Sequence, residues 1–238
     1  MSKLCFIGIG NPGAKYDETK HNIGKDWLNK ICHELNLEFV LKEKLEAKIA
    51  TSSNNDFILA IPTNFVNNTG KTIQKIMRYS NISCENLVVF HDDLDLNPGE
   101  VKIKLGGGHG GHNGLKDIFE KTGSKKFYRI RIGIGHPGDK SDVTNWVLSK
   151  SKPKDKTLIE EGFYDLSKVF NLICEKKFYR IRIGIGHPGD KCDVSNWVLS
   201  KSKPKDKILI EESFYDLSRV FKLICERKFS EAQLQLHT

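Results

Sequence analysis

The fold class of this 238-residue chain follows from the sequence of residues 87–118, LVVFHDDLDLNPGEVKIKLGGGHGGHNGLKDI. The apolar start, residues 87–90, has the length and composition of a buried strand. The alternating segment 101–105 predicts an antiparallel strand, and the glycine loop 106–111 leads into a helix predicted for about 112–122. Strand, strand and helix in this order indicate an α/β protein.

Similar patterns continue on both sides of this segment. Apolar runs and helical spacing predict strands at 4–9, 57–61 and 128–134, a shorter β segment near Trp146–Leu148, and helices at about 24–35, 69–78 and 158–173. Strands that alternate with helices favour a single α/β domain, with a mixed twisted β-sheet flanked by helices. Functional loops are then expected at the carboxyl ends of the strands.

The composition is that of an ordinary globular protein, with 38% hydrophobic and 29% charged residues. It excludes the collagen-like and low-complexity classes. No apolar run approaches the roughly 18–20 residues that a membrane helix needs, and the N-terminal residues lack the apolar stretch of a signal peptide. The six scattered cysteines contain no C-x-x-C pair and favour a reducing compartment. We therefore expect a cytoplasmic protein without membrane contact.

An internal repeat occupies the C-terminal half. Residues 127–177 return as residues 178–228, with a period of 51 residues and seven differences. Two near-identical copies indicate a tandem duplication within a single-domain protein, because solenoids need at least three units. The second copy has 11 basic and 7 acidic residues, so it supplies half of the formal net charge of +8. Without it the chain is only mildly basic, which is compatible with nucleic-acid contact but does not establish it.

Polar clusters follow the predicted strands or begin the predicted helices. They are Asn11–Tyr16–His21, Asn67–Asn68, His91–Asp92–Asp93 and His112–Asn113. Together they offer an imidazole, a carboxylate and several carboxamides, without a serine or cysteine nucleophile that has an evident partner and without the ligand set of a metal centre. Such a set suits a hydrolase in which a histidine takes a proton from water, a carboxylate fixes the tautomer of its ring, and amides stabilise the oxyanion.

Four motifs carry a family resemblance: residues 7–24 (IGIGNPGAKYDETKHNIG), 62–70 (PTNFVNNTG), 91–118 and 127–140 (FYRIRIGIGHPGDK). Through them the chain resembles the bacterial-type peptidyl-tRNA hydrolase family over essentially residues 3–175. The resemblance implies a monomeric α/β fold with a mixed sheet. It also implies hydrolysis of the ester that joins a peptide to the 3′ ribose of tRNA, without a metal or cofactor.

The resemblance also implies roles for single residues. His21 matches the catalytic base of the family, and Asp92 matches the carboxylate that orients it. Asn11 matches the amide that positions the substrate near the base. Asn67 and Asn113 match the carboxamides that hold the peptidyl part and the attacking water.

Further substrate contacts follow from the same match. Tyr16 matches a tyrosine beside the site, and Lys104 and Arg131 match basic residues that grip the 5′-phosphate of tRNA. Arg182 is the position equivalent to Arg131 in the second copy. Val66 stands where the family usually has methionine, so we expect a wider or shallower peptide pocket.

The repeat divides the chain in this interpretation. Residues 1–177 form the catalytic domain, residues 178–228 an appended β-β-α duplicate, and residues 229–238 a C-terminal tail. The first copy is favoured for completing the core because it closes the shorter loop, although loop length itself costs little. The expected state is a monomer, with domain swapping through the duplicated segment as the alternative.

Three other functions stay open on the sequence alone. One is a tRNA-binding protein whose catalysis the duplication has impaired. Another is a nicotinamide-dependent oxidoreductase, because Gly8-x-Gly10-x-x-Gly13 matches the dinucleotide fingerprint. The third is a metal phosphoesterase that would use His91 and the acids of the HDDLD motif.

Overall fold

The computed structural model describes residues 3–174 of the chain. Seven strands form one sheet in the order β2-β3-β4-β1-β5-β7-β6. They are β1 (Leu4–Gly8), β2 (Val40–Lys42), β3 (Ala47–Thr51), β4 (Phe57–Pro62), β5 (Leu87–Asp93), β6 (Val101–Leu105) and β7 (Tyr128–Gly133). The pairs β1–β4, β1–β5 and β5–β7 are parallel, and the pairs β2–β3, β3–β4 and β6–β7 are antiparallel. The predicted mixed sheet is confirmed.

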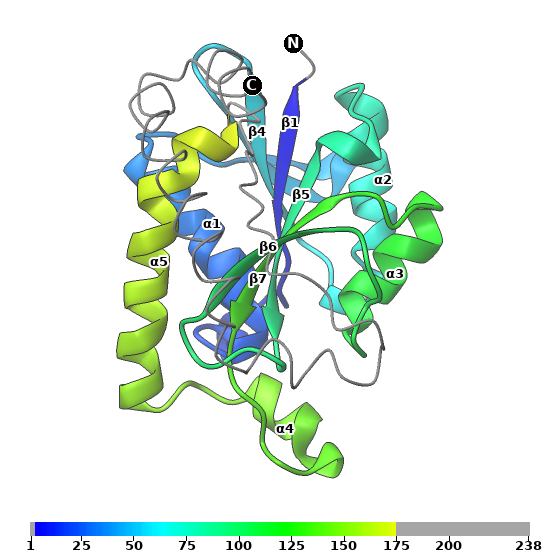
Figure 1. The fold of residues 1–238 in the computed structure, drawn as a ribbon. Coiled ribbons are helices and arrows are strands. Elements are labelled where there is room, and N and C mark those ends of the chain that lie inside the picture. The colour runs from blue at the N-terminus through cyan, green and yellow to red at the C-terminus, as the bar shows by residue number, and fades with distance from the viewer. Residues whose placement is uncertain (1–2, 175–238) are drawn as a thin grey trace, which may run out of the picture. The chain divides into compact units, whose positions relative to one another are not determined.

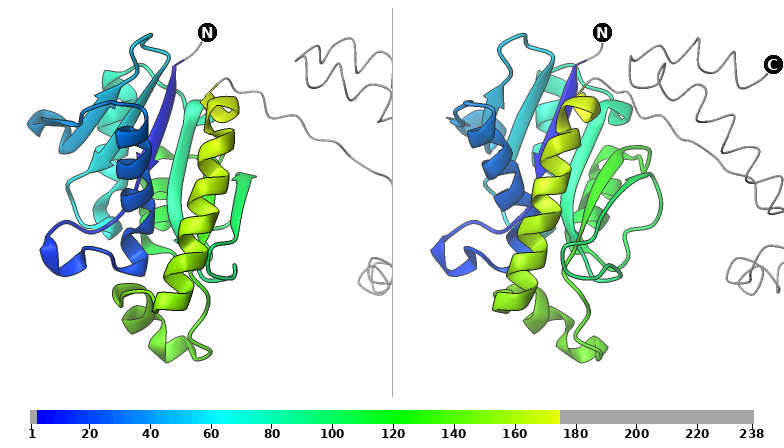
Figure 2. Two further views of the ribbon diagram at one scale, coloured as in Figure 1. Left: turned by 90° about the vertical axis from the view of Figure 1, so that its left-hand side faces the viewer. Right: turned by 60° about the vertical axis from the view of Figure 1, so that its left-hand side comes forward.

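Helices cover both faces of this sheet. They are α1 (Ile23–Glu34), α2 (Gly70–Tyr79), α3 (Asn113–Thr122), α4 (Val143–Leu148) and α5 (Pro153–Cys174). α1 and α5 lie on one face, and α2 and α3 lie on the other (Figure 1). Figure 2 shows α5 running along its face of the sheet, with α4 beyond its N-terminal end. Residues 3–174 therefore form three layers, as expected of an α/β domain.

Successive side chains of the central strands point to opposite faces of the sheet, so each face has its own hydrophobic core. In β1, Leu4 and Phe6 pack with the side chains of α1 and α5, whereas Cys5 and Ile7 pack with those of α2 and α3. All five residues of β1 are buried. A parallel strand that is covered on both faces is apolar throughout, which is why residues 4–9 gave a continuous apolar signal.

The strand predicted near Trp146–Leu148 is wrong, because these residues end helix α4. β7 already pairs with β5 on one side and with β6 on the other, so the sheet has no free edge beside it. Trp146 instead anchors α4 by donating from Nε1 to the carbonyl oxygen of Gly135, at 3.0 Å.

β2 and β3 were not predicted from the sequence. All three residues of β2 are exposed, and β3 is a short edge-side strand that includes an exposed lysine, Lys48. Neither strand has an apolar run long enough to be recognised, and their pairing comes from the sheet itself. β5 is also longer than predicted, because residues 91–93 continue its pairing with β7.

Within residues 3–174, no helix is long and apolar enough to cross a membrane. The duplicate predicted for residues 178–228, Arg182 within it, and the tail at 229–238 lie outside the described residues. β7 and α5 come from the first copy of the repeat.

Candidate active site

The candidate site lies where the carboxyl ends of the parallel strands meet. Asn11 follows β1, Asn67 follows β4 in the short helix η4 (Val66–Asn68), and Asp92 belongs to the end of β5. His21 lies in the short helix η2 (Lys20–Asn22), directly before α1. Neighbouring parallel strands end at the same edge, so loops far apart in sequence converge there.

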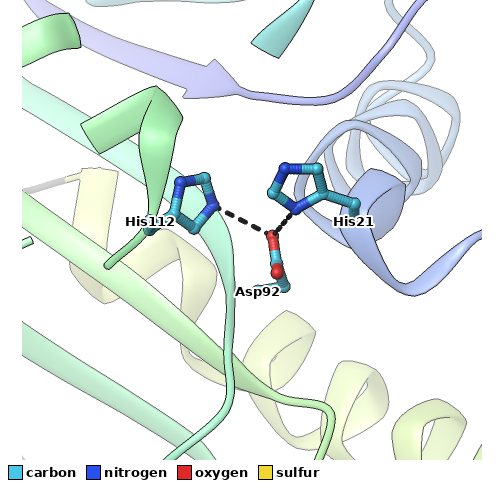
Figure 3. A group of neighbouring side chains, drawn as sticks. All are labelled: His21, Asp92 and His112. Carbon is cyan, nitrogen blue, oxygen red and sulfur yellow. Dashed lines mark hydrogen bonds and ion pairs between the residues drawn. The ribbon is translucent and has the colours of Figure 1, made fainter. Parts of the chain in front are cut away.

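The central contact joins His21 to Asp92. The Nδ1 atom of His21 lies 2.9 Å from Oδ1 of Asp92, and the two side chains face one another in Figure 3. The Asp92 residue is buried, with 4% of its surface exposed. With the Nδ1 proton directed at the carboxylate, the neutral ring of His21 keeps the lone pair on Nε2, which is the atom that can accept a proton.

His112 is a third member of this group. It belongs to one of the polar clusters of the sequence, but no motif assigned it a role. Its Nε2 atom lies 3.0 Å from the same Oδ1 atom of Asp92 (Figure 3). Its Nδ1 atom accepts hydrogen bonds from the backbone N–H groups of Gly114 and Leu115, at 3.1 and 3.4 Å, so His112 is the N-cap of α3. Because Nδ1 accepts, the proton of the neutral ring is on Nε2 and is donated to Asp92.

These contacts set the charge states of the pair. Burial alone would raise the pKa of the Asp92 carboxyl, but the charges and hydrogen bonds of His21 and His112 hold it far below its ordinary value. Burial works to lower the pKa of His21, but the charge and hydrogen bond of Asp92 outweigh it and raise the pKa above the ordinary 6.5. Asp92 is therefore a carboxylate, and the pKa of His21 lies above its ordinary value because of the carboxylate beside it.

His91 contacts both the backbone of Asp92 and the ring of His112. Its Nδ1 atom lies 2.7 Å from the backbone oxygen of Asp92, and its ring meets that of His112 edge to face at 5.2 Å. Burial, together with the neighbouring His112, lowers the pKa of His91 to about 3. The ring is therefore neutral and does not compete with His21 for a proton.

Asn11 connects the first loop to η4. Its Oδ1 atom accepts the backbone N–H of Val66 at 3.0 Å, and its own backbone N–H donates to Oδ1 of Asn22 at 2.7 Å. Asn11 is 6% exposed. Because the amide oxygen is occupied, the NH₂ group of Asn11 is the end that remains for a ligand.

A pocket of about 810 Å³ joins these groups. All nine residues that the sequence predicted for the site line it, namely Asn11, Tyr16, His21, Val66, Asn67, Asp92, Lys104, Asn113 and Arg131. Val66 is 5% exposed and belongs partly to the core that it forms with α2 and α3. The sequence thus identified residues that the fold brings together.

Aromatic and apolar walls of the pocket were not predicted. Phe65 is 51% exposed and meets the ring of Tyr16 edge to face at 6.0 Å. On another side, Val143, Val147 and Leu148 of α4 line the pocket. Phe65 and Val143 gave no functional signal in the sequence, because a single apolar residue near the surface is common in any protein. Val147 and Leu148 fell within the β segment predicted near Trp146–Leu148, which gave them no place in the site.

The α4 wall is fastened to the loop that carries His21. The Nζ atom of Lys20 donates to Oγ of Ser149 at 2.8 Å and to the backbone oxygen of Lys150 at 3.0 Å, and it lies 4.1 Å from the ring centroid of Trp146. Lys20 is 3% exposed, and burial lowers the pKa of its ammonium group. Lys20, the residue directly before the candidate base His21, therefore connects the loop of His21 to the α4 wall of the pocket.

Basic residues line another side. Lys104 is exposed on β6, whereas Arg131 of β7 donates from Nε to Oδ2 of Asp93 at 2.6 Å. Burial would raise the pKa of Asp93, but the hydrogen bond from Arg131 lowers it. Arg129, which the sequence analysis did not single out, is 3% exposed and donates to the carbonyl oxygens of Gly106 and Gly108, so that it holds the glycine loop in place.

The glycine fingerprint at residues 8–13 is used for packing. A Cβ on Gly8 would lie 2.7 Å from the backbone oxygen of Gly24, and one on Gly10 would lie 2.9 Å from Oδ1 of Asn22. The three-residue helix η1 (Ala14–Tyr16) follows Gly13. A dinucleotide loop leads straight into a long helix whose N-terminus faces the pyrophosphate, so this geometry does not support the oxidoreductase hypothesis.

One group of side chains has the composition of a metal site. The ligand atoms of His21, Asp92 and His112 lie within 4.8 Å of one another. However, Nδ1 of His112 accepts the cap hydrogen bonds, so Nε2 carries the proton that a cation would have to displace. The arrangement favours a hydrogen-bonded carboxylate, and Asp93 of the proposed phosphoesterase set is engaged by Arg131.

A buried carboxylate that orients an imidazole, in a pocket lined with amides at the edge of an α/β sheet, is characteristic of a hydrolase that activates water. Comparison with known sequences agrees with this class. The sequence profile of the family "Peptidyl-tRNA hydrolase" matches residues 5–177, and a second match covers residues 164–238. The chain belongs to the peptidyl-tRNA hydrolase family.

Individual relatives support this assignment. The chain is 43% identical over 189 residues to the peptidyl-tRNA hydrolase of Shewanella halifaxensis. This match covers 76% of this chain and 97% of the relative. It is 44% identical over 165 residues to the peptidyl-tRNA hydrolase of Delftia acidovorans, and the match covers 68% of this chain and 79% of that relative. The crystal structure of peptidyl-tRNA hydrolase from Acinetobacter baumannii matches with a TM-score of 0.71 and 30% identity, over 74% of this chain and 90% of that structure.

Proposed function

We propose that the chain hydrolyses the ester bond between the peptide and tRNA in peptidyl-tRNA, with His21 as the base and Asp92 as the carboxylate that orients it. The observation that carries the proposal is the 2.9 Å contact between Nδ1 of His21 and Oδ1 of Asp92 inside the pocket. Membership of the family supplies the class of substrate.

In the proposed mechanism a water molecule is the nucleophile. Nε2 of His21 takes a proton from the water as its oxygen attacks the ester carbonyl carbon. Asp92 accepts the Nδ1 proton of His21 in a hydrogen bond and stabilises the imidazolium that forms, without becoming protonated. General base catalysis of this kind contributes about 10²- to 10⁴-fold to the rate.

Carboxamides stabilise the intermediate. The NH₂ group of Asn11 is oriented by the hydrogen bond from Val66 to its amide oxygen, and it supplies a donor at the edge of the pocket. Asn67 and Asn113 are exposed in the same pocket, where they hold the peptidyl part and the water. Donors aimed at the developing oxyanion lower the barrier because they need no reorganisation.

Collapse of the intermediate completes the reaction. The bond between the carbonyl carbon and the 3′ oxygen of the ribose breaks, and the imidazolium of His21 returns its proton to that oxygen. The products are a peptide with a free carboxylic acid, which loses its proton to solvent and becomes a carboxylate, and a tRNA with a free hydroxyl. One water is consumed, and His21 is neutral again.

Lys104 and Arg131 grip the 5′-phosphate of the tRNA in this proposal. Arg131 is held by Asp93, so its position is fixed before the substrate binds, whereas Lys104 is exposed and adapts to the phosphate. Tyr16 and its edge-to-face neighbour Phe65 offer apolar surface to the peptide or the terminal base. We further propose that the protein acts as a cytoplasmic monomer, since one chain supplies every residue of the mechanism.

The test compares release of free tRNA from N-acetylaminoacyl-tRNA by the full chain and by its H21N variant. We expect a loss of at least about 10²-fold in kcat. H33N is the matched control, because His33 is an exposed histidine of α1, and its rate should equal that of the unmodified chain. An unchanged rate in H21N would overturn the mechanism. Salt-dependent tRNA binding without turnover by the full chain would favour the impaired tRNA-binding alternative.

A further inference from the structure

Two glycines bring the backbone of α5 into direct contact with the turn between β5 and β6. A Cβ on Gly162 of α5 would overlap the carbonyl oxygen of Gly99, and a Cβ on Gly99 would overlap the carbonyl oxygen of Leu158. Neither position has room for a side chain. We call this contact between Gly99 and Gly162 the glycine seat.

The turn cannot easily retreat to admit a larger residue. The backbone N–H of Gly99 donates to the carbonyl oxygen of Gly133 at 3.2 Å, and the N–H of Gly133 donates to that of Glu100 at 2.8 Å. A Cβ on Gly133 would in turn overlap the carbonyl oxygen of Asn97. Gly99 also has a φ of 83°, a conformation that favours glycine. The turn is thus fixed between β7 and α5.

The two copies of the repeat differ at this seat. The second copy has Ser213 where the first has Gly162. The other differing positions with described burial, Ser141, Thr144, Thr157 and Lys168, are all exposed. Glycine in the interior of a helix is unfavourable relative to serine, so its presence at 162 indicates a packing requirement.

We propose that the glycine seat admits the first copy of the repeat and excludes the second. Residues 127–174 then complete the catalytic domain, and the second copy cannot replace them, either within one chain or by exchange from another. β7 does not discriminate, because the sequence FYRIRIGIGHPGDK that contains it is the same in both copies. In α5, the differences at Thr157 and Lys168 fall on exposed residues, so Gly162 is the buried difference among the positions with described burial. A single buried position therefore determines which copy belongs to the enzyme.

The seat bears on the candidate site because β7 carries Arg131 and lies beside the strand of Asp92. Asp92 is in register with Ile132 of β7. Exchange of the copies would put Arg182 in the place of Arg131. A seat that accepts only the first copy makes Arg131 the arginine at the site.

Hydrogen exchange of the full chain, followed by mass spectrometry, tests the proposal without any measurement of activity. Peptides from 153–174 and from 204–225 differ in mass at several positions, so the two copies are read separately. In the unmodified chain we expect slower exchange in 153–174. The G162S variant should exchange at least about tenfold faster in 153–174. In the G162S/S213G variant the protection should pass to 204–225.

T157I is the matched control, because it places the residue of the second copy at an exposed position of the same helix. Its exchange should equal that of the unmodified chain. Unchanged protection of 153–174 in G162S would overturn the proposal. Absence of protection in 204–225 of the G162S/S213G variant would also overturn it, since the glycine would then not be the residue that selects the copy. Neither result bears on whether His21 is the base.

Discussion

Nε2 of His112 lies 3.0 Å from Oδ1 of Asp92, and His112 makes this contact from the N-cap position of α3. The cap hydrogen bonds fix which ring nitrogen carries the proton, so the start of a helix determines the direction of a hydrogen bond in the site. Asp92 therefore receives two imidazole donors on one oxygen. A carboxylate with two donors is held in both position and charge.

Replacement of His112 separates its role as the N-cap of α3 from its role as a hydrogen-bond donor to Asp92. Asparagine is a good N-cap but is too short to reproduce the contact with Asp92, whereas alanine loses both functions. We expect H112A to lose about 1 kcal/mol of unfolding free energy from the cap. H112N should keep most of this stability, and both variants should lose about tenfold or more in kcat, as expected for a hydrogen bond to a charged group. Thermal unfolding together with initial rates checks this, and wild-type kcat in H112N would contradict a positioning role.

The pH dependence of the rate reports the pairing of His21 with Asp92. Because Asp92 raises the pKa of His21, the acidic limb of the profile of kcat/KM should lie above pH 6.5, the ordinary value for histidine. His21 acts as a base only when it is neutral, so activity falls as the pH drops through this pKa. D92N removes the charge, which should move the limb to lower pH and reduce kcat by about 10²- to 10⁴-fold. A limb that stays in place in D92N would show that Asp92 does not set the titration.

Lys104 should contribute to binding of tRNA and not to the chemical step. In K104A we expect KM to rise, kcat to remain, and the slope of log affinity against log salt to fall in magnitude by about 0.7 to 0.9, the value for one phosphate contact. K102A is the control on the same strand, because Lys102 is paired with Glu100 at 2.6 Å. A salt slope that is equal in K104A and in the unmodified chain would argue against a phosphate contact.

Lys20 should affect substrate binding, because it holds the α4 wall of the pocket in place. K20M keeps the length of the side chain but removes the hydrogen bonds to Ser149 and Lys150. We expect KM to rise roughly tenfold because the α4 wall is released, with the acidic limb of the pH profile unchanged. K20R should recover part of the loss. K48M, at an exposed position of β3, is the control. A shift of the pH limb in K20M would instead indicate that Lys20 acts on His21 directly.

Much of the fold was accessible from the sequence, for identifiable physical reasons. β1 and β5 are covered on both faces and gave continuous apolar runs. The strand predicted at Trp146–Leu148 failed because no free edge of the sheet exists there, which only the topology reveals. β2 has exposed residues throughout and left no pattern to recognise.

The site was predicted unevenly for a similar reason. His21 and Asp92 could be named because family motifs identify them, and the fold brings them together. His112 stands in one of the polar clusters of the sequence, but no motif assigned it a role. It is the N-cap of α3, and its second ring nitrogen also reaches Asp92. The role of Lys20 was not accessible, because its partners lie about 130 residues away.

In the proposed mechanism, water activated by His21 attacks the carbonyl carbon of the ester. A single turnover of N-acetylaminoacyl-tRNA by excess enzyme in ¹⁸O-labelled water shows which bond is broken. We expect one ¹⁸O atom in the carboxylate of the released peptide and none in the ribose hydroxyl of the tRNA. Label in the ribose hydroxyl, or a first-turnover peptide without label, would contradict it.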